Sequence, residues 1–205
     1  MDHVAIRTLG TPRLGLHQLA PVLADAGYEQ TGSYDFVQKR LRAASYSHRS
    51  GSVPRIFVSE LLADAFSDSF RDIIDRLVAQ QDHEAEELLW NPACDWARVS
   101  SSDYEVLLAE SEYAAWVGAY GLRINHFTVG FDQLSGFQSL EEVNRHLQDH
   151  GFQLNGGANL IHGSKERLLQ QSSTIAELID WKFGDGTVRR VRRAELRAEP
   201  LRPLD

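Results

Sequence analysis

Two histidines occupy matching places in two similar segments of the chain. His3 precedes Gly27 by 24 residues, and His126 precedes Gly151 by 25. Neutral imidazole is the commonest side-chain ligand of protein-bound metals, and the pseudo-twofold of a duplicated fold brings equivalent positions together. The repeat therefore makes His3 and His126 a candidate metal pair. Without the repeat, either side chain would more simply be an ordinary core or surface histidine.

Arg7 follows His3 by four residues in a segment typical of a β-strand. That even spacing puts both side chains on one face of the strand. A guanidinium can bind a carboxylate through two parallel hydrogen bonds. We therefore expect Arg7 to bind an anionic substrate in the cavity that holds the metal. The alternative is an ion pair between Arg7 and a nearby acid.

The order of apolar runs and turn residues predicts two units of the order β-α-β-β-β. Gly27 and Gly151 each end the helix of one unit, and Asp185-Gly186 is typical of a hairpin turn. The first unit is expected to have a strand over 4–9, a helix over 14–23 and strands over 28–31, 40–47 and 55–59. The second is expected to have a strand over 122–131, a helix over 140–150 and strands over 152–154, 168–172, 175–183 and 187–197, one strand more than the first.

The part between the units differs because its apolar residues recur at helical spacing. We expect its last helix over 103–120, with Ser102 as the N-cap and Glu105 completing a capping box. The predicted fold class is α+β. Two βαβββ modules, residues 1–60 and 121–205, would form a curved sheet around a metal site, with the helical segment 61–120 inserted between them.

Composition excludes several classes of protein. A formal net charge of −8 over 205 residues disfavours nucleic acid as a partner, because nucleic acid needs a basic face. No apolar run approaches the roughly 20 residues of a membrane span and no signal peptide is visible, so we expect a cytoplasmic protein with no membrane partner. The single cysteine, Cys94, allows no intrachain disulfide. We interpret the basic run 189–193 as solvated arginines on a strand and not as an RNA contact.

Six segments together carry a family resemblance. They are Asp2-His3-Val4-Ala5-Ile6-Arg7-Thr8, Tyr34-Asp35-Phe36 with Lys39, Pro54 to Leu61, Ser111 to Trp116, Asn125-His126-Phe127-Thr128, and Gln171 to Ala176. In this order they cover almost the whole chain. They resemble the family of 2-oxoadipate dioxygenase/decarboxylases, also called hydroxyglutarate synthases, within the vicinal-oxygen-chelate, or glyoxalase-like, superfamily.

The resemblance implies an Fe(II) enzyme that uses O2 to convert a 2-oxo dicarboxylic acid, such as 2-oxoadipate, into a 2-hydroxy acid with loss of CO2. It implies a metal site of two histidines and one glutamate, with His3 and His126 as the histidines and Arg7 on the substrate carboxylate. Such a site leaves open positions on an octahedral iron for a chelating 2-oxo acid and O2. Another divalent metal, the length of the substrate chain and a homodimer stay open.

The third metal ligand stays open between three glutamates. The family's glutamate lies in the last strand, where Glu195 followed by Leu196 is the best match, although the family's aromatic neighbours are absent. Glu199 shares the strand face of Glu195 at a period of two. Glu60 ends the fourth strand of the first module, at the position we take as equivalent to a fourth metal corner. The alternative for Glu60 is a charge at the start of the next helix.

Four further residues are candidates for substrate binding. Lys39 could supply a second contact to an anion. Gln171, Ser172 and Ser173 are uncharged hydrogen-bonding residues that could bind the distal end of a substrate. The alternative is that these three residues only shape a strand crossing.

Two other functions stay as alternatives. Members of the family carry a helical segment ahead of the first histidine, whereas this chain begins two residues before it. Together with the altered last strand, this suggests a divergent member that has lost catalysis and acts as a binding protein. The other alternative is a different reaction of the superfamily, catalysed by an isomerase or a lyase.

Overall fold

The computed structural model describes residues 1–205 except 92–95, 97, 158, 165–168, 194 and 200–205. For residues 164, 169 and 195–199 it describes the backbone alone. Cys94 therefore lies outside the described residues. Within the described ranges, no helix has the length and apolar character needed to cross a membrane.

The first module has the predicted order β-α-β-β-β. Its strand β1 runs parallel to β4, and β2, β3 and β4 follow as an antiparallel meander. The elements are β1 (His3–Leu9), α1 (Leu16–Asp25), β2 (Tyr28–Phe36), the short helix η1 (Val37–Lys39), β3 (Leu41–His48) and β4 (Arg55–Leu61). Burial alternates along β4, where Ile56, Val58 and Glu60 are buried and the residues between them are partly exposed, as expected for a strand with two different faces.

The second module repeats this order with an added hairpin. Its strand β5 runs parallel to β10, β10 runs antiparallel to β7, and β7 runs antiparallel to β6. The elements are β5 (Arg123–Gly130), η3 (Phe131–Gln133), α6 (Leu140–Asp149), β6 (His162–Ser164), β7 (Leu169–Ser173), the hairpin β8 (Leu178–Lys182) and β9 (Val188–Arg192), and β10 (Glu195–Glu199).

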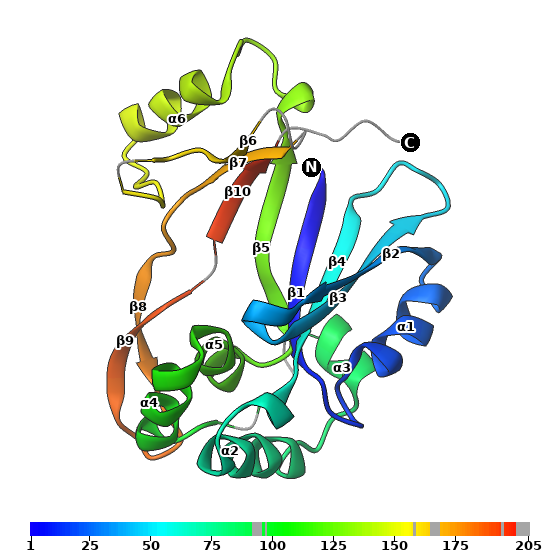
Figure 1. Ribbon diagram of the computed structural model, residues 1–205, viewed down its shortest axis with the longest axis vertical. Helices are drawn as coiled ribbons and strands as arrows, with labels where there is room; N and C mark the ends of the chain where they lie inside the picture. Colours follow the sequence, from blue (N-terminus) through cyan, green and yellow to red (C-terminus); the bar gives the residue numbers. More distant parts are fainter. Residues whose placement is uncertain (92–95, 97, 158, 165–168, 194, 200–205) are drawn as a thin grey trace.

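The two modules join through β1 and β5 into one eight-stranded sheet (Figure 1). Its order is β2-β3-β4-β1-β5-β10-β7-β6. Read from the junction outward, each half has the same sequence of strands, so β1 matches β5 and β4 matches β10. The fold class predicted from the sequence is therefore confirmed within the described residues.

The helical segment between the modules lies beside one end of the sheet (Figure 1). It contains η2 (Ala63–Ala65), α2 (Asp68–Ala79), α3 (Ala85–Trp90), α4 (Ser101–Glu110) and α5 (Glu112–Tyr120). The single helix predicted over 103–120 is wrong. Ser111 has an extended backbone between α4 and α5 and accepts a hydrogen bond from the backbone N–H of Ala114, so it caps a new helix.

The cap of α4 also differs from the prediction. Ser100, and not Ser102, accepts the hydrogen bond from the backbone N–H of Asp103. Glu105 forms an ion pair with Arg189 of β9 instead of completing a capping box. The basic run on β9 is thus tied to α4, although most of its side chains are exposed.

Two strand predictions in the second module are wrong. Residues 152–154 form no strand, and Leu154 makes only an isolated bridge to Thr174. The run 187–197 is broken into β9 and β10, because β9 pairs with β8 in a separate hairpin while β10 returns to the main sheet. The hairpin turn predicted at Asp185-Gly186 is confirmed.

One face of the main sheet packs into the hydrophobic core, and the other carries the candidate site residues. On one face, Leu19 and Leu23 of α1 belong to the same buried core as Ile6 and Val58. The other face carries the odd-numbered residues of β1, including His3 and Arg7, and we call it the site face. Successive residues of a strand point to opposite faces. Because the apolar residues must face the core, the residues between them must face the site.

Candidate metal centre

His3 and His126 lie close together on the site face. His3 of β1 stands opposite Thr128 of β5, and His126 stands opposite Ala5. Because residues two apart in a strand share a face, both imidazoles point to the same side of the sheet. Their ring centroids are 6.1 Å apart, in an edge-to-face arrangement. The structure thus brings together the two histidines that the repeat pairs.

Each imidazole is held through its Nδ1 atom by the residue directly before it. The Nδ1 of His3 lies 2.7 Å from the carboxylate Oδ2 of Asp2, and the Nδ1 of His126 lies 3.0 Å from the amide Oδ1 of Asn125. An oxygen acceptor at Nδ1 fixes the tautomer that keeps its proton there. In the neutral ring, Nε2 then carries a free lone pair, which is the form that ligates a metal.

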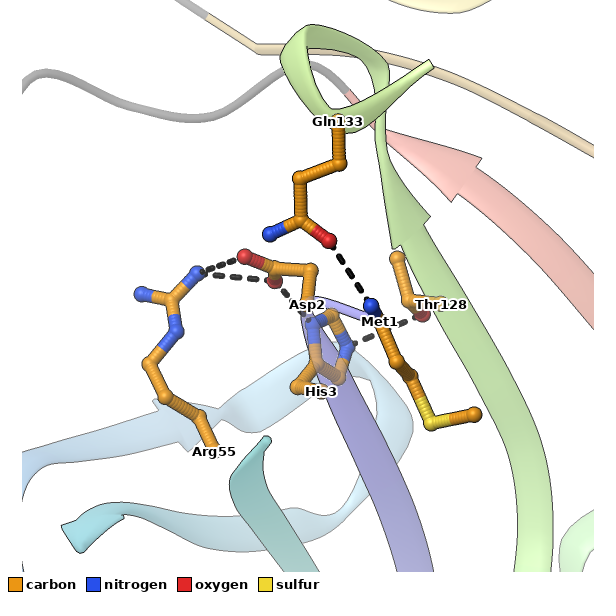
Figure 2. Close-up of polar contacts among 6 residues, drawn as sticks. All are labelled: Met1, Asp2, His3, Arg55, Thr128 and Gln133. Carbon is orange, nitrogen blue, oxygen red and sulfur yellow. Dashed lines mark hydrogen bonds and ion pairs between the residues drawn. The ribbon is translucent and has the colours of Figure 1, made fainter. Parts of the chain in front are cut away.

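Arg55 supports the Asp2–His3 pair (Figure 2). One guanidinium nitrogen of Arg55 lies 2.7 Å from each carboxylate oxygen of Asp2. Burial raises the pKa of Asp2, but the hydrogen bonds and charges of His3 and Arg55 outweigh burial and lower it below its ordinary value. Asp2 is therefore a carboxylate that is held in place from both sides.

Thr128 makes the remaining polar contact of the first imidazole. Its hydroxyl oxygen lies 3.1 Å from the Nε2 of His3, as Figure 2 shows. With the Nδ1 proton directed at Asp2, the hydroxyl donates to the Nε2 lone pair. A metal at His3 would take the place of this donor, so the Thr128 hydroxyl would have to turn to another acceptor.

The register places Glu195 beside the histidine pair. Glu195 of β10 is the direct partner of His126 in β5, whereas Glu199 is the partner of Gly130. Glu199 is thus four residues, or roughly 13 Å, further along the strand. The carboxylates of both residues lie outside the described side chains, among which no group of three or more His, Cys, Asp or Glu suited to a metal is found. The backbone register therefore favours Glu195 over Glu199.

Glu60 does not occupy the fourth metal corner. It pairs with Thr8, an even-numbered residue of β1, and so faces away from His3. Its Oε2 accepts a hydrogen bond of 2.8 Å from the backbone N–H of Leu16, and its Oε1 lies 2.6 Å from Arg42. Glu60 thus caps the start of α1, which precedes it in the chain.

The residue that corresponds to Glu195 in the first module is Arg55. The parallel pair β1–β4 matches His3 with Arg55, just as β5–β10 matches His126 with Glu195. An arginine does not ligate a metal. The site therefore has at most three protein ligands from these equivalent positions, and Arg55 supports a ligand instead of being one.

Arg7 lies further along the site face, beside a hollow of about 540 Å³. Its guanidinium carbon is 4.9 Å from the centre of the Tyr113 ring and 5.4 Å from that of Trp116. The hollow is lined by Arg7, Gln38, Lys39, Arg40, Leu41, Phe66, Glu110, Ser111, Glu112 and Tyr113. The structure thus brings Arg7 and Lys39 to one cavity with a third cation, Arg40.

Tyr113 anchors the wall behind Arg7. Its hydroxyl donates to the carbonyl of Ser59 over 2.5 Å and accepts from the backbone N–H of Thr8 over 3.1 Å. Burial raises the pKa of Tyr113 to about 12, so the phenol stays neutral and keeps its donor proton. These bonds fix α5 on β1 and β4.

The three candidates on β7 do not act together. Ser173 pairs with Arg197, which pairs with Thr128, so Ser173 belongs to the site face. Ser172 points to the opposite side, where its hydroxyl donates to Asn144 of α6 over 2.5 Å. Gln171 shares the face of Ser173 by its spacing. Ser172 is therefore a contact to α6 and not a side chain of the site face.

Sequence reasoning missed Asp2, Asn125, Arg55 and Thr128 as supporting residues. A signal for the first two was present, because each precedes one histidine of the repeat. Arg55 carried no such signal, since its role depends on the register between β1 and β4.

A protein-family model described as 2-oxoadipate dioxygenase/decarboxylase matches residues 1–94 and 80–197. The chloroplastic/amyloplastic 2-oxoadipate dioxygenase/decarboxylase of Oryza sativa subsp. japonica is 34% identical over 207 residues, covering 94% of this chain and 57% of the relative. The chloroplastic enzyme of Arabidopsis thaliana with the same name is 33% identical over 205 residues, covering 93% and 55%. The chain thus spans little more than half the length of these relatives.

A crystal structure also resembles the whole described chain. The hydroxyglutarate synthase from Oryza sativa, solved in complex with 2-oxoadipate, matches with a TM-score of 0.89 and 32% identity. The match covers 99% of this chain and 70% of that chain. The similarity therefore extends across both modules and the helical segment between them.

Proposed function

Because the chain belongs to the 2-oxoadipate dioxygenase/decarboxylase family, we propose that it converts 2-oxoadipate, or a closely similar 2-oxo dicarboxylic acid, to a 2-hydroxy acid. The reaction takes up one O2 and releases one CO2, so the product is one carbon shorter and keeps the distal carboxylate. The observation that carries this proposal is the pair of imidazoles with both Nδ1 atoms held by oxygen acceptors.

The donor set fits a divalent metal. His3 and His126 would ligate through Nε2, and Glu195 would supply the carboxylate. Two neutral nitrogens and one anion suit Fe(II), and they also suit another divalent metal such as Mn(II). When bound, Fe(II) supplies the redox chemistry that lets O2 react with the chelated 2-oxo acid.

The chain's own residues would orient the substrate. Along β1, the Cα atom of Arg7 is roughly 13 Å from the Cα atom of His3, at the usual rise of a strand. A six-carbon dicarboxylate with its 2-oxo end at the histidines would extend in this direction, toward the guanidinium of Arg7 and the ammonium of Lys39. Bidentate binding by Arg7 would then hold the distal carboxylate and select for a second acid group.

Aromatic rings on the site face could cover the methylene chain. Phe57 pairs with Ala5 in the sheet, and its ring centroid is 5.6 Å from that of Tyr34. Tyr34 in turn stacks on Phe36 at 6.4 Å. Apolar contacts of this kind exclude water from the space between two polar ends.

Oxygen uptake tests the proposed reaction. The protein reconstituted with Fe(II) should consume O2 and release CO2 in equal amounts with 2-oxoadipate. His3→Ala and His126→Ala should each abolish metal binding and O2 uptake, whereas His146→Ala, at an exposed position of α6, should do neither. Retained activity in either site variant would contradict the proposal. Metal binding without O2 uptake would favour an isomerase or lyase, and absence of metal after reconstitution would favour a binding protein.

A further inference from the structure

Trp116 of α5 contacts two parts of the site at once. Its side chain is almost fully buried, and its ring faces the guanidinium of Arg7 at 5.4 Å. The indole N–H donates a hydrogen bond of 2.5 Å to the backbone carbonyl of Arg193. One rigid aromatic plane thus joins the arginine of β1 to the chain that leads into β10.

Arg193 lies between the end of β9 and the start of β10. It follows β9 and precedes Glu195 by two residues, and its own N–H donates to the carbonyl of Glu177 over 3.0 Å. With both backbone groups of Arg193 bonded, the chain enters β10 from a fixed point. Glu195, two residues further on, is the register partner of His126.

We propose that Trp116 is a positioning residue that couples carboxylate binding at Arg7 to the placement of Glu195 beside His126. This inference rests on the proposed function, because it assumes that Arg7 binds a substrate carboxylate and that Glu195 ligates the metal. It assigns a role to a residue that touches neither substrate nor metal.

The physical basis is the shape of the indole. A bound carboxylate fixes the guanidinium of Arg7, whose planar face then packs on a fixed ring. The ring has two side-chain torsions, so ordering it at one edge also orders the N–H at the other. The N–H in turn holds the Arg193 carbonyl. By thermodynamic linkage, a carboxylate that favours this arrangement tightens metal binding, and metal tightens carboxylate binding by the same factor.

The coupling can be separated from direct chelation by comparing two ligands with the same 2-oxo acid end. We would measure the Kd of Mn(II) by titration at saturating 2-oxoadipate and at saturating 2-oxohexanoate, which lacks the distal carboxylate. For the unaltered chain, 2-oxoadipate should give a Kd about 5-fold or more below that with 2-oxohexanoate, the lower end of typical coupling. In Trp116→Phe, which keeps a ring but loses the N–H donor, the two Kd values should become equal.

Trp90→Phe is the matched control. Trp90 is the last residue of α3 and its side chain is half exposed, so its substitution should preserve the ratio of the two Kd values. Equal Kd values in the unaltered chain, or an unchanged ratio in Trp116→Phe, would overturn the inference while leaving the proposed function intact. Failure of the unaltered chain to bind Mn(II) would instead overturn both. A thermal melt of Trp116→Phe establishes that its fold is retained.

Discussion

The rings of His3 and His126 meet edge to face, with centroids 6.1 Å apart, across the junction of the two modules. This junction is where the repeated first strands pair, so duplication of one βαβββ unit places one histidine from each copy at the same site. The local sequence repeats as well, because an acceptor for Nδ1 precedes each histidine. The site is thus a product of the pseudo-twofold arrangement and of an oxygen acceptor that directly precedes each histidine, Asp2 in one module and Asn125 in the other.

The Asp2–His3 contact should strengthen metal binding. Asp2→Asn keeps the shape of the side chain but removes the charge that orients His3 and pairs with Arg55. Loss of such an outer contact typically weakens metal affinity by about 10–100-fold. A Mn(II) titration measures the change. Asp25→Asn, at an exposed position of α1, is the control, and equal affinities in the two variants would contradict the role given to Asp2.

Arg7 should distinguish a dicarboxylate from a monocarboxylate. In Arg7→Gln, the charge-assisted hydrogen bonds to the distal carboxylate are lost, at a cost of about 1.5–3 kcal/mol. We expect the KM for 2-oxoadipate to rise by roughly 10–100-fold, with a much smaller change for 2-oxohexanoate. Steady-state O2 uptake with both acids checks this. A parallel rise for both acids would show that Arg7 does not bind the distal end.

Glu60 should matter for stability and not for metal. Glu60→Gln removes the ion pair with Arg42 and weakens the cap on α1, which should lower the free energy of unfolding by about 1–3 kcal/mol. Chemical denaturation measures this loss, with Glu29→Gln as a control because the Glu29–Arg49 pair is exposed and contributes little. A loss of Mn(II) affinity in Glu60→Gln would contradict the placement of Glu60 on the core face.

Asp185 should make stability depend on pH. Hydrogen bonds from the Ser101 side chain, the Thr187 backbone and the Ser101 backbone hold the pKa of Asp185 well below its usual range. A lowered folded-state pKa gives stability that is complete above the unfolded-state pKa, about 3.9, and that declines as the pH falls toward the folded-state pKa. Asp185→Asn should therefore lower the Tm by a few degrees at pH 7 and by less at pH 3. An equal difference at both pH values would exclude this carboxylate as the cause.

The two modules could be predicted from the sequence because the periodicity of buried residues marks both sheets and helices. The predictions are wrong where hydrogen-bond partners decide where a helix ends or which strands pair. Ser111 has no apolar signal, yet its extended backbone ends α4 and its side chain caps the start of α5. The pattern of residues 187–197 predicts one strand, but β9 pairs with β8 in the separate hairpin and β10 pairs with β5 in the main sheet.

The part of the site that could be predicted is the part that follows from the sequence repeat and from the alternation of side chains along a strand. His3 and Arg7 share a face by their even spacing in β1, and His126 shares it because it pairs with Ala5. Glu60 and Ser172 were candidates for the site, but both side chains point away from the site face. Which residues of a strand face the site depends on how that strand pairs with its neighbour, and the sequence alone does not give that register. Arg55 could be recognised as the counterpart of Glu195 only once both parallel pairs were aligned.

A crystal structure of the protein loaded with Fe(II) under anaerobic conditions, with anomalous diffraction at the iron edge, tests the central claim most directly. We predict one iron peak bonded to Nε2 of His3 and Nε2 of His126, with a carboxylate oxygen of Glu195 at about 2.0–2.2 Å. Iron bound without either histidine, or a Glu195 carboxylate directed away from the ion, would contradict the account.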